Sequence, residues 1–194
     1  MRQWLAVLSV VSAVVALVKY LQASGNEHLL RLSQQDLTRQ LRLGLPLTID
    51  TSPFSHLRLD EPRVQLREGY NAIAVSLSVS LVLPTSERHL TGDLQFTAGV
   101  ALCADAGSLY LCDPEINHCK LVDLPGQYDV RLRTALRAAI AKFCTDTALY
   151  PFAGTVAGER LAGMKLNDVM VVDRNLMVAL DTQKASNRAA FYQS

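Results

Sequence analysis

The stretch from Tyr70 to Leu83 alternates between large apolar and small side chains along most of its length. Because successive side chains of a strand point to opposite faces, this period of two predicts a long β-strand with one apolar face and one small, polar face. The apolar face requires another layer to cover it. The apolar residues are Ile73, Val75, Leu77, Val79, Leu81 and Leu83, and the small residues are Ala74, Ser76, Ser78 and Ser80.

Further strands are predicted on both sides of this one. After a turn at 84–88 comes a second long strand, and after a tight turn at 105–107 comes a third, from Ser108 to Cys112, so the three form an antiparallel meander. Upstream, a period of two begins at Leu47, and its parity slips by one residue at Pro62, which a proline-associated bulge explains. The apolar face of the second strand carries Leu94, Phe96, Ala98, Val100 and Leu102.

Two helices flank the meander. Ser33 is a good N-cap for a helix over 34–43, and Gly44 and Pro46 end that helix. A longer helix is predicted over 127–149, broken at Pro151, and its length of about 30 to 35 Å matches a long sheet. Its apolar stripe consists of Leu132, Leu136, Ala139, Ile140 and Phe143.

The chain closes with a short helical piece near 156–164 and a hairpin whose strands cover 166–172 and 176–180. Its turn is Asp173-Arg174-Asn175. The order of a helix, several strands, a long helix and closing strands predicts an α+β fold, in which a long curved antiparallel sheet wraps around one long helix.

The N-terminus carries a membrane signal, because residues 4–18 contain no charged side chain. Lys19 can extend its ammonium group to the interface while Trp4 and Tyr20 lie at headgroup depth, so 4–21 predicts a short transmembrane signal-anchor. A cleaved signal peptide is the alternative, but a cut after Ala23 would place Leu21 where a small residue is preferred. We therefore divide the chain into an anchor (1–24), one α+β domain (25–182) and a tail (183–194).

Charge and cysteine content limit the function classes. The 19 lysines and arginines nearly balance 18 acids, so the chain lacks the positive field that nucleic-acid binding needs. The four cysteines, Cys103, Cys112, Cys119 and Cys144, can pair in an oxidising compartment. Cys112 and Cys119 flank the turn-rich stretch 113–118, which predicts a disulfide between them across a hairpin loop. A zinc site at Cys112, His118 and Cys119 lacks a fourth ligand, and we expect no metal or cofactor.

Several short segments resemble one family in their order and spacing. They are Ser33 to Leu37, Gly69-Tyr70-Asn71, Gly92, Gly107 to Ile116 and Leu149-Tyr150-Pro151. Over about 33–181 the chain resembles the YceB-like family of bacterial envelope lipoproteins, whose fold is related to tubular lipid-binding domains. It departs from that family by lacking the lipidated cysteine and by adding four others. The resemblance implies an envelope protein with a curved sheet on a helix, an apolar groove and no catalytic residues. Together with the predicted anchor, it implies a single-pass protein of the bacterial inner membrane with its domain in the periplasm.

No catalytic motif is recognisable. The four histidines are scattered, and the neighbouring acids Asp60-Glu61 and Asp113 with Glu115 lie beside prolines, where turns are commonly acidic. We expect a non-enzymatic protein that binds lipid or another apolar ligand between sheet and helix; a closed core is the alternative for the same residues. The predicted lining is Val75, Leu77, Val79, Leu81, Phe96, Val100, Leu132, Leu136, Ile140 and Phe143.

A second hypothesis is a structural subunit that docks onto a larger envelope membrane complex. In that case the small polar face of the sheet would be a contact surface, because a face exposed to bare solvent usually carries lysine and glutamate. Its residues are Ser76, Ser78, Ser80, Thr97 and Gly99.

Overall fold

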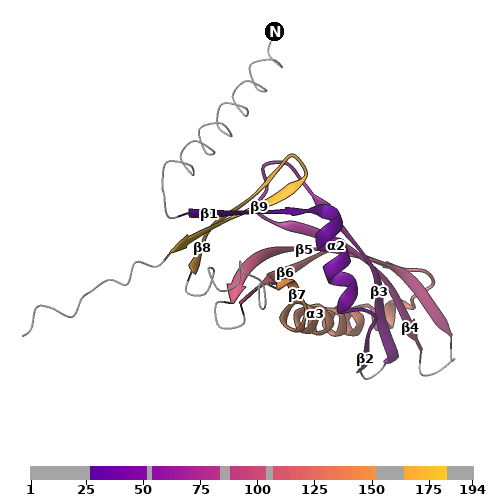
Figure 1. The fold of residues 1–194 in the computed structure, drawn as a ribbon. Helices are drawn as coiled ribbons and strands as arrows, with labels where there is room; N and C mark the ends of the chain where they lie inside the picture. Colours follow the sequence, from indigo (N-terminus) through magenta and orange to yellow (C-terminus); the bar gives the residue numbers. More distant parts are fainter. Residues whose placement is uncertain (1–26, 52–53, 84–87, 104–106, 152–163, 183–194) are drawn as a thin grey trace, which may run out of the picture.

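A computed structural model describes residues 27–51, 54–83, 88–103, 107–151 and 164–182 (Figure 1). The described residues form nine strands, two α-helices and one short 3-10 helix. In chain order these are β1 (Glu27–Ser33), α2 (Gln34–Leu43), β2 (Leu47–Thr51), β3 (Phe54–Leu66), β4 (Ile73–Val82), β5 (His89–Cys103), β6 (Ser108–Leu121), η1 (Gly126–Tyr128), α3 (Asp129–Asp146), β7 (Ala148–Pro151), β8 (Met164–Val172) and β9 (Asn175–Thr182).

The strands form two antiparallel sheets. The larger sheet has the order β2-β3-β4-β5-β6-β7, and the smaller has the order β1-β9-β8. In Figure 1 the smaller sheet forms the upper part of the molecule, and α3 lies below. The predicted α+β class and the antiparallel meander are confirmed.

The six-stranded sheet is curled. Helix α3 contacts both β2 and β6, although three strands separate these two in the sheet, and α2 likewise contacts both β3 and β7. A flat sheet could not bring both pairs of strands to one helix, so the sheet bends into a half-barrel with α3 along it. One continuous hydrophobic cluster joins the inner faces of both sheets to α2 and α3.

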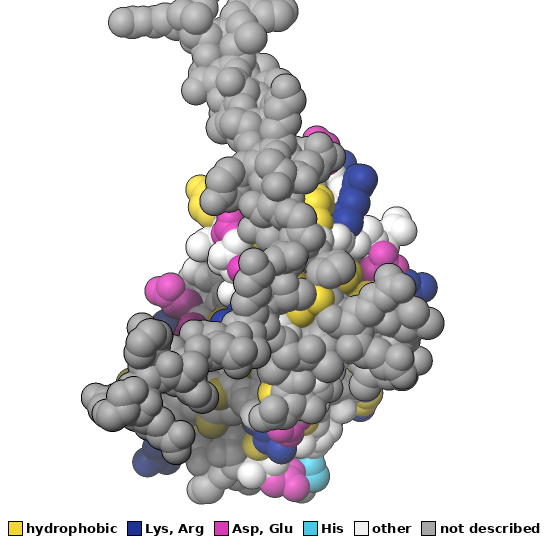
Figure 2. Space-filling view, turned by 60° about the vertical axis from the view of Figure 1, so that its left-hand side comes forward, with side chains coloured by type: hydrophobic (Ala, Val, Ile, Leu, Met, Phe, Trp, Pro, Cys, Tyr) yellow, Lys and Arg dark blue, Asp and Glu magenta, His cyan; other side chains and the backbone are white. Residues whose placement is uncertain are grey.

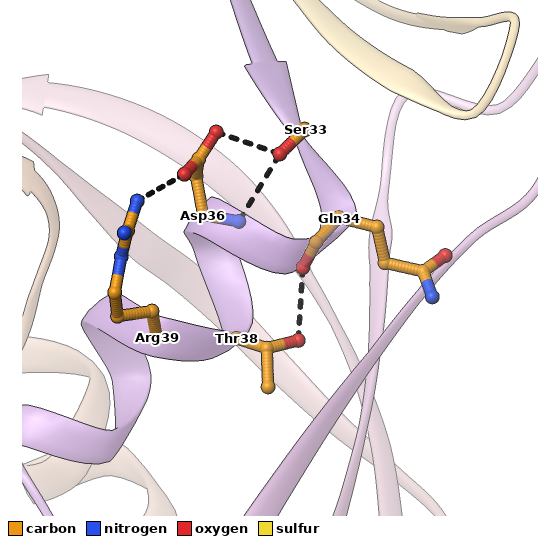
Figure 3. Close-up of polar contacts among 5 residues, drawn as sticks. All are labelled: Ser33, Gln34, Asp36, Thr38 and Arg39. Carbon is orange, nitrogen blue, oxygen red and sulfur yellow. Dashed lines mark hydrogen bonds and ion pairs between the residues drawn. The ribbon is translucent and has the colours of Figure 1, made fainter.

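Helix α2 covers an open edge of β3. Thr38 Oγ1 accepts a hydrogen bond from Val64 N at 3.3 Å, and Gln34 Oε1 accepts one from Leu66 N at 3.4 Å. The predicted cap is confirmed, since Ser33 Oγ accepts from Asp36 N at 3.1 Å (Figure 3). Such capping satisfies a backbone N–H that the helix itself leaves without a partner.

The parity slip at Pro62 is a bulge, as predicted. The register between β3 and β4 shifts between Asp60 and Arg63, and Glu61 has a φ of 50°. The predicted final hairpin is confirmed as well, with Asp173 and Arg174 both at positive φ, as the tightest hairpin turns require.

The two sheets are joined at the turn after β3. Gly69 N donates to Val171 O at 3.1 Å, and Val171 N donates to Tyr70 O at 2.9 Å, so this turn pairs with the edge of β8. Gly69 has a φ of 77°, which a side chain would strain. The sheets therefore share backbone hydrogen bonds as well as a core.

The predicted hairpin between Cys112 and Cys119 is wrong. Strand β6 continues through both residues, and the register with β5 absorbs the extra residues as a bulge, where Asp113 has a φ of 47°. The seven residue steps from Cys112 to Cys119 along a strand place the two α-carbons about 23 Å apart, whereas a disulfide needs roughly 4.4 to 6.8 Å. The predicted Cys112 to Cys119 disulfide is thus not formed, and all four cysteines are free.

Other boundaries also differ from the predictions. Strand β1 was not expected, and α3 ends at Asp146 because Ala148 to Pro151 pairs with β6. The predicted anchor (4–21), most of the helical piece 156–164, and the tail (183–194) lie outside the described residues. No helix in the described part of the chain is long and apolar enough to cross a bilayer.

Candidate functional site

The candidate site is the interior between the curled sheet and α3. Strand β4 alternates buried and half-buried residues without interruption from Ile73 to Val82, which turns one apolar row inward. Strand β5 adds a second row of inward apolar side chains beside the first, because Val75 lies opposite Phe96 and Leu77 lies opposite Leu94. The apolar stripe of α3 completes this interior, as its periodicity predicted.

All ten predicted lining residues lie in this interior. Each has at most 8% of its surface exposed, and all ten belong to the continuous hydrophobic cluster. The sequence therefore selected side chains that are buried, and the structure packs them against one another and against additional residues. The additional residues are chiefly Leu37 and Leu41 of α2, Leu57 and Leu59 of β3, and the inner face of the three-stranded sheet.

Helix α3 is attached to the sheet through apolar contacts. The ion pairs described for its side chains stay within the helix, joining Arg133 Nε to Asp129 Oδ2 at 3.1 Å and Lys142 Nζ to Asp146 Oδ2 at 2.5 Å. Its outward residue Val130 is 74% exposed, whereas Leu136 and Ala139 are fully buried. The helix is thus attached to the sheet through one buried apolar face.

Specific contacts hold both ends of α3, and sequence reasoning missed them. At the N-terminus Tyr128 packs its ring against Phe54 of β3, with ring centroids 5.9 Å apart. At the C-terminus Thr147 lies so close to Gly44 that a β-carbon on Gly44 would come within 2.2 Å of Thr147 Oγ1. Only the glycine after α2 signalled this approach in the sequence, and a helix end explains that glycine equally well.

Described residues line two open depressions on the surface, and none of the ten predicted residues contributes to either of them. One of about 450 Å³ lies beside the β3 bulge, and one of about 600 Å³ lies where α2, β3 and the turn between β8 and β9 meet. Both linings are mostly polar. The first includes Arg42, Asp60 and Arg63, and the second includes Gln34, Arg67 and Arg174.

The four cysteines are free thiols and lie on β5, β6 and α3. Burial raises the pKa of Cys112 and of Cys119, and burial together with the nearby Cys112 raises the pKa of Cys144 to about 12. Thiolates are the reactive form of cysteine, so the raised pKa values favour the less reactive thiol form of these three groups. Cys103 lies exposed at the end of β5.

The acids weighed for catalysis lie at the surface. A hydrogen bond from Arg58, at 2.7 Å, and one from the backbone of Glu61 hold the pKa of Asp60 below its usual range. Glu61 accepts a hydrogen bond from Ser78 Oγ at 3.1 Å, and Asp113 and Glu115 are exposed. A carboxyl with a lowered pKa is ionised at neutral pH and has no proton to donate.

Histidines and metal ligands do not gather in the described residues. His56 Nδ1 lies 3.1 Å from Asp50 Oδ1, and both side chains are mostly exposed. His89 and His118 are exposed on β5 and β6. Among the residues that the structure describes, no group of three or more histidine, cysteine or acidic side chains is placed to hold a metal ion.

The comparisons with known proteins add no family. Neither the protein-family models nor the curated proteins contain a match to this sequence.

Proposed function

We propose that this chain is a non-catalytic protein of the bacterial envelope, tethered by residues 4–21 to the inner membrane with its domain in the periplasm. Its function is to bind an acyl chain or another apolar ligand between the curled sheet and α3. The observation that carries this proposal is that the ten predicted lining residues converge on one continuous apolar interior.

The apolar attachment of α3 to the sheet is compatible with a ligand that displaces part of the helix from the sheet. Apolar contacts are non-directional, so an acyl chain can replace one apolar neighbour with another without leaving buried polar groups unsatisfied. The described ion pairs of α3 are internal and would move with the helix. In this proposal the site is closed at rest and opens when the ligand enters. The resemblance to the YceB-like family is consistent with it.

Native mass spectrometry of residues 25–194, purified without detergent and followed by organic extraction, tests this proposal. We expect co-purifying acyl lipid, and we expect Leu136→Trp or Val79→Trp to abolish it by filling the interior. The matched control is Arg137→Trp, which places the same side chain on the exposed face of α3. Ligand-free protein that also fails to take up added fatty acid would contradict the proposal.

The second candidate function is a docking subunit of a larger envelope complex. The tight burial of the ten interior residues favours it, because a closed core needs no ligand. The small, low-charge outer face of β4 and β5 would then be the contact surface. Ser80→Arg and Thr97→Arg place charge on that face and should release the protein from a complex detected by blue native electrophoresis. An unchanged migration of wild type and variants as monomers would contradict this candidate.

A further inference from the structure

The three-stranded sheet has a second apolar face, which points away from the core. The register places Leu29 opposite Ala179 and Met177 opposite Met170, and these residues alternate with the core residues on the same strands. Because alternate residues of a strand point to opposite sides, this set faces outward. We call it the outer patch; it consists of Leu29, Met170, Val172, Met177 and Ala179.

The outer patch is separate from the hydrophobic core. Leu176, Val178 and Leu180 of β9 belong to the core cluster, whereas Ala179 between them is buried but lies outside that cluster. Leu29 is 45% exposed, whereas Met170, Val172 and Met177 are half-buried. Figure 2 shows hydrophobic side chains at the surface in the upper part of the described molecule, among charged and polar ones. The outward face of this sheet therefore carries apolar side chains beside charged ones, whereas an outward face that meets solvent usually alternates with the core face as a polar one.

The position of β1 indicates what covers the outer patch. Strand β1 is an edge of this sheet and begins at Glu27, so only residues 22–26 separate it from the apolar segment 4–21. Five extended residues reach at most about 18 Å. If residues 4–21 span the bilayer, as the proposed function has it, the three-stranded sheet is the part of the domain held closest to the membrane.

We infer that the outer patch lies on the bilayer and inserts shallowly at the headgroup boundary. The register also places charged residues on this face, namely Arg31, Lys165, Asp168 and Asp181, with Glu27 opposite Asp181. Cations do not predominate, so burial of apolar area drives the contact rather than attraction to anionic lipid. The tether makes this contact intramolecular, and a patch too weak to bind membranes from solution is then sufficient.

Tryptophan fluorescence of the full chain in phosphatidylcholine vesicles with brominated acyl chains tests this inference. The chain has a single tryptophan, Trp4, in the proposed anchor. In a Trp4→Phe background, Met177→Trp reports on the outer patch, and Gln95→Trp reports on the outer face of β5 as the matched control. We expect several-fold stronger quenching for Met177→Trp than for Gln95→Trp.

Wild-type Trp4 separates this inference from the membrane tether on which it rests. If lipid quenches Trp4 but leaves Met177→Trp as accessible to aqueous acrylamide as Gln95→Trp, the tether holds and the outer-patch contact is overturned. If lipid does not quench Trp4, the tether fails, and the inference fails with it. Leu29→Trp is a second reporter in the same background, because Leu29 is half-exposed and a larger side chain fits there without disturbing the core.

Discussion

The two sheets share one core but differ on their outer faces. The outward residues of β4 are serine and alanine at most positions, whereas those of β1, β8 and β9 include leucine, methionine and valine beside charged residues. The six-stranded sheet therefore has its large apolar side chains on one face, which points to the interior around α3. The smaller sheet has apolar side chains on both faces. This difference is the basis for the inferred contact of the smaller sheet with the bilayer; the outer face of the half-barrel offers no comparable set of apolar side chains.

The largest effects should come from the inner faces, where the sheets are alike. Leu77→Ala in β4 and Leu180→Ala in β9 each remove a fully or almost fully buried side chain from one cluster, so each should lower the free energy of unfolding by about 2 to 5 kcal/mol. Urea denaturation followed by circular dichroism measures this. The control is Leu43→Ala, at a residue that is 78% exposed, which should change the free energy by less than about 0.5 kcal/mol.

A separate early transition in Leu180→Ala alone would break this part of the comparison. It would mean that the three-stranded sheet unfolds independently, despite the shared core and the hydrogen bonds between Val171 and the turn at Gly69 and Tyr70.

The next effect should distinguish the sheets, because the half-barrel depends on a close backbone approach. A β-carbon on Gly92 would lie 2.0 Å from Lys120 O and 2.7 Å from Leu121 Cα in β6. Backbone atoms cannot move aside as a flexible side chain can, so Gly92→Ala should lower the free energy of unfolding by about 1 to 3 kcal/mol. Gly126→Ala is the control, since no atom lies within 4 Å of its added carbon. Equal stability of the two variants would contradict the tight pairing of β5 and β6.

The third effect is an alkaline instability that belongs to the half-barrel, which with α3 contains all four cysteines. Burial raises the pKa of Cys144 to about 12 from an ordinary value of 9.0, so the folded chain holds this proton more tightly than the unfolded chain. The contribution of the protonated Cys144 thiol to the free energy of unfolding is fully present below pH 9.0. It decreases by about 1.4 kcal/mol per pH unit as the pH rises from 9.0 toward 12. Urea midpoints at pH 8 and pH 10, under reducing conditions, measure the slope.

Cys144→Ala is the control for that slope. It also leaves a small cavity, so the comparison is between pH dependences and not between absolute stabilities. The variant should show a flatter decline than wild type; an identical decline would assign the alkaline effect to other groups.

The smallest effect should come from the junction of the smaller sheet with α2. Ser33→Ala removes the hydroxyl that caps α2 through Asp36 N, and helix caps contribute about 1 kcal/mol. Thermal and urea denaturation of Ser33→Ala and Ser33→Thr measure it, with threonine expected to retain most of the cap. A loss equally large in Ser33→Thr would show that packing at this junction, and not the cap, is responsible.

Local patterns predicted much of this fold. The alternation from Ile73 to Val82 predicted β4, the parity slip at Pro62 predicted the bulge, and Ser33 predicted the start of α2. Each of these depends on neighbours within a few residues, which is the range that a sequence pattern records. The apolar stripe of α3 also selected its buried residues correctly, because a helix has a fixed period.

Long-range pairing decided the features that the sequence left ambiguous. The stretch Asp113 to His118 has turn chemistry, but β5 is long enough to pair with β6 beyond it, so the same residues form a bulge and the two cysteines lie far apart. Strand β1 was not predicted from its own sequence, and its pairing with β9 identifies it. Likewise, periodicity selects an apolar face but does not indicate whether that face is filled; the tertiary structure packs the ten predicted lining residues into a core, because packing density depends on every layer that meets there.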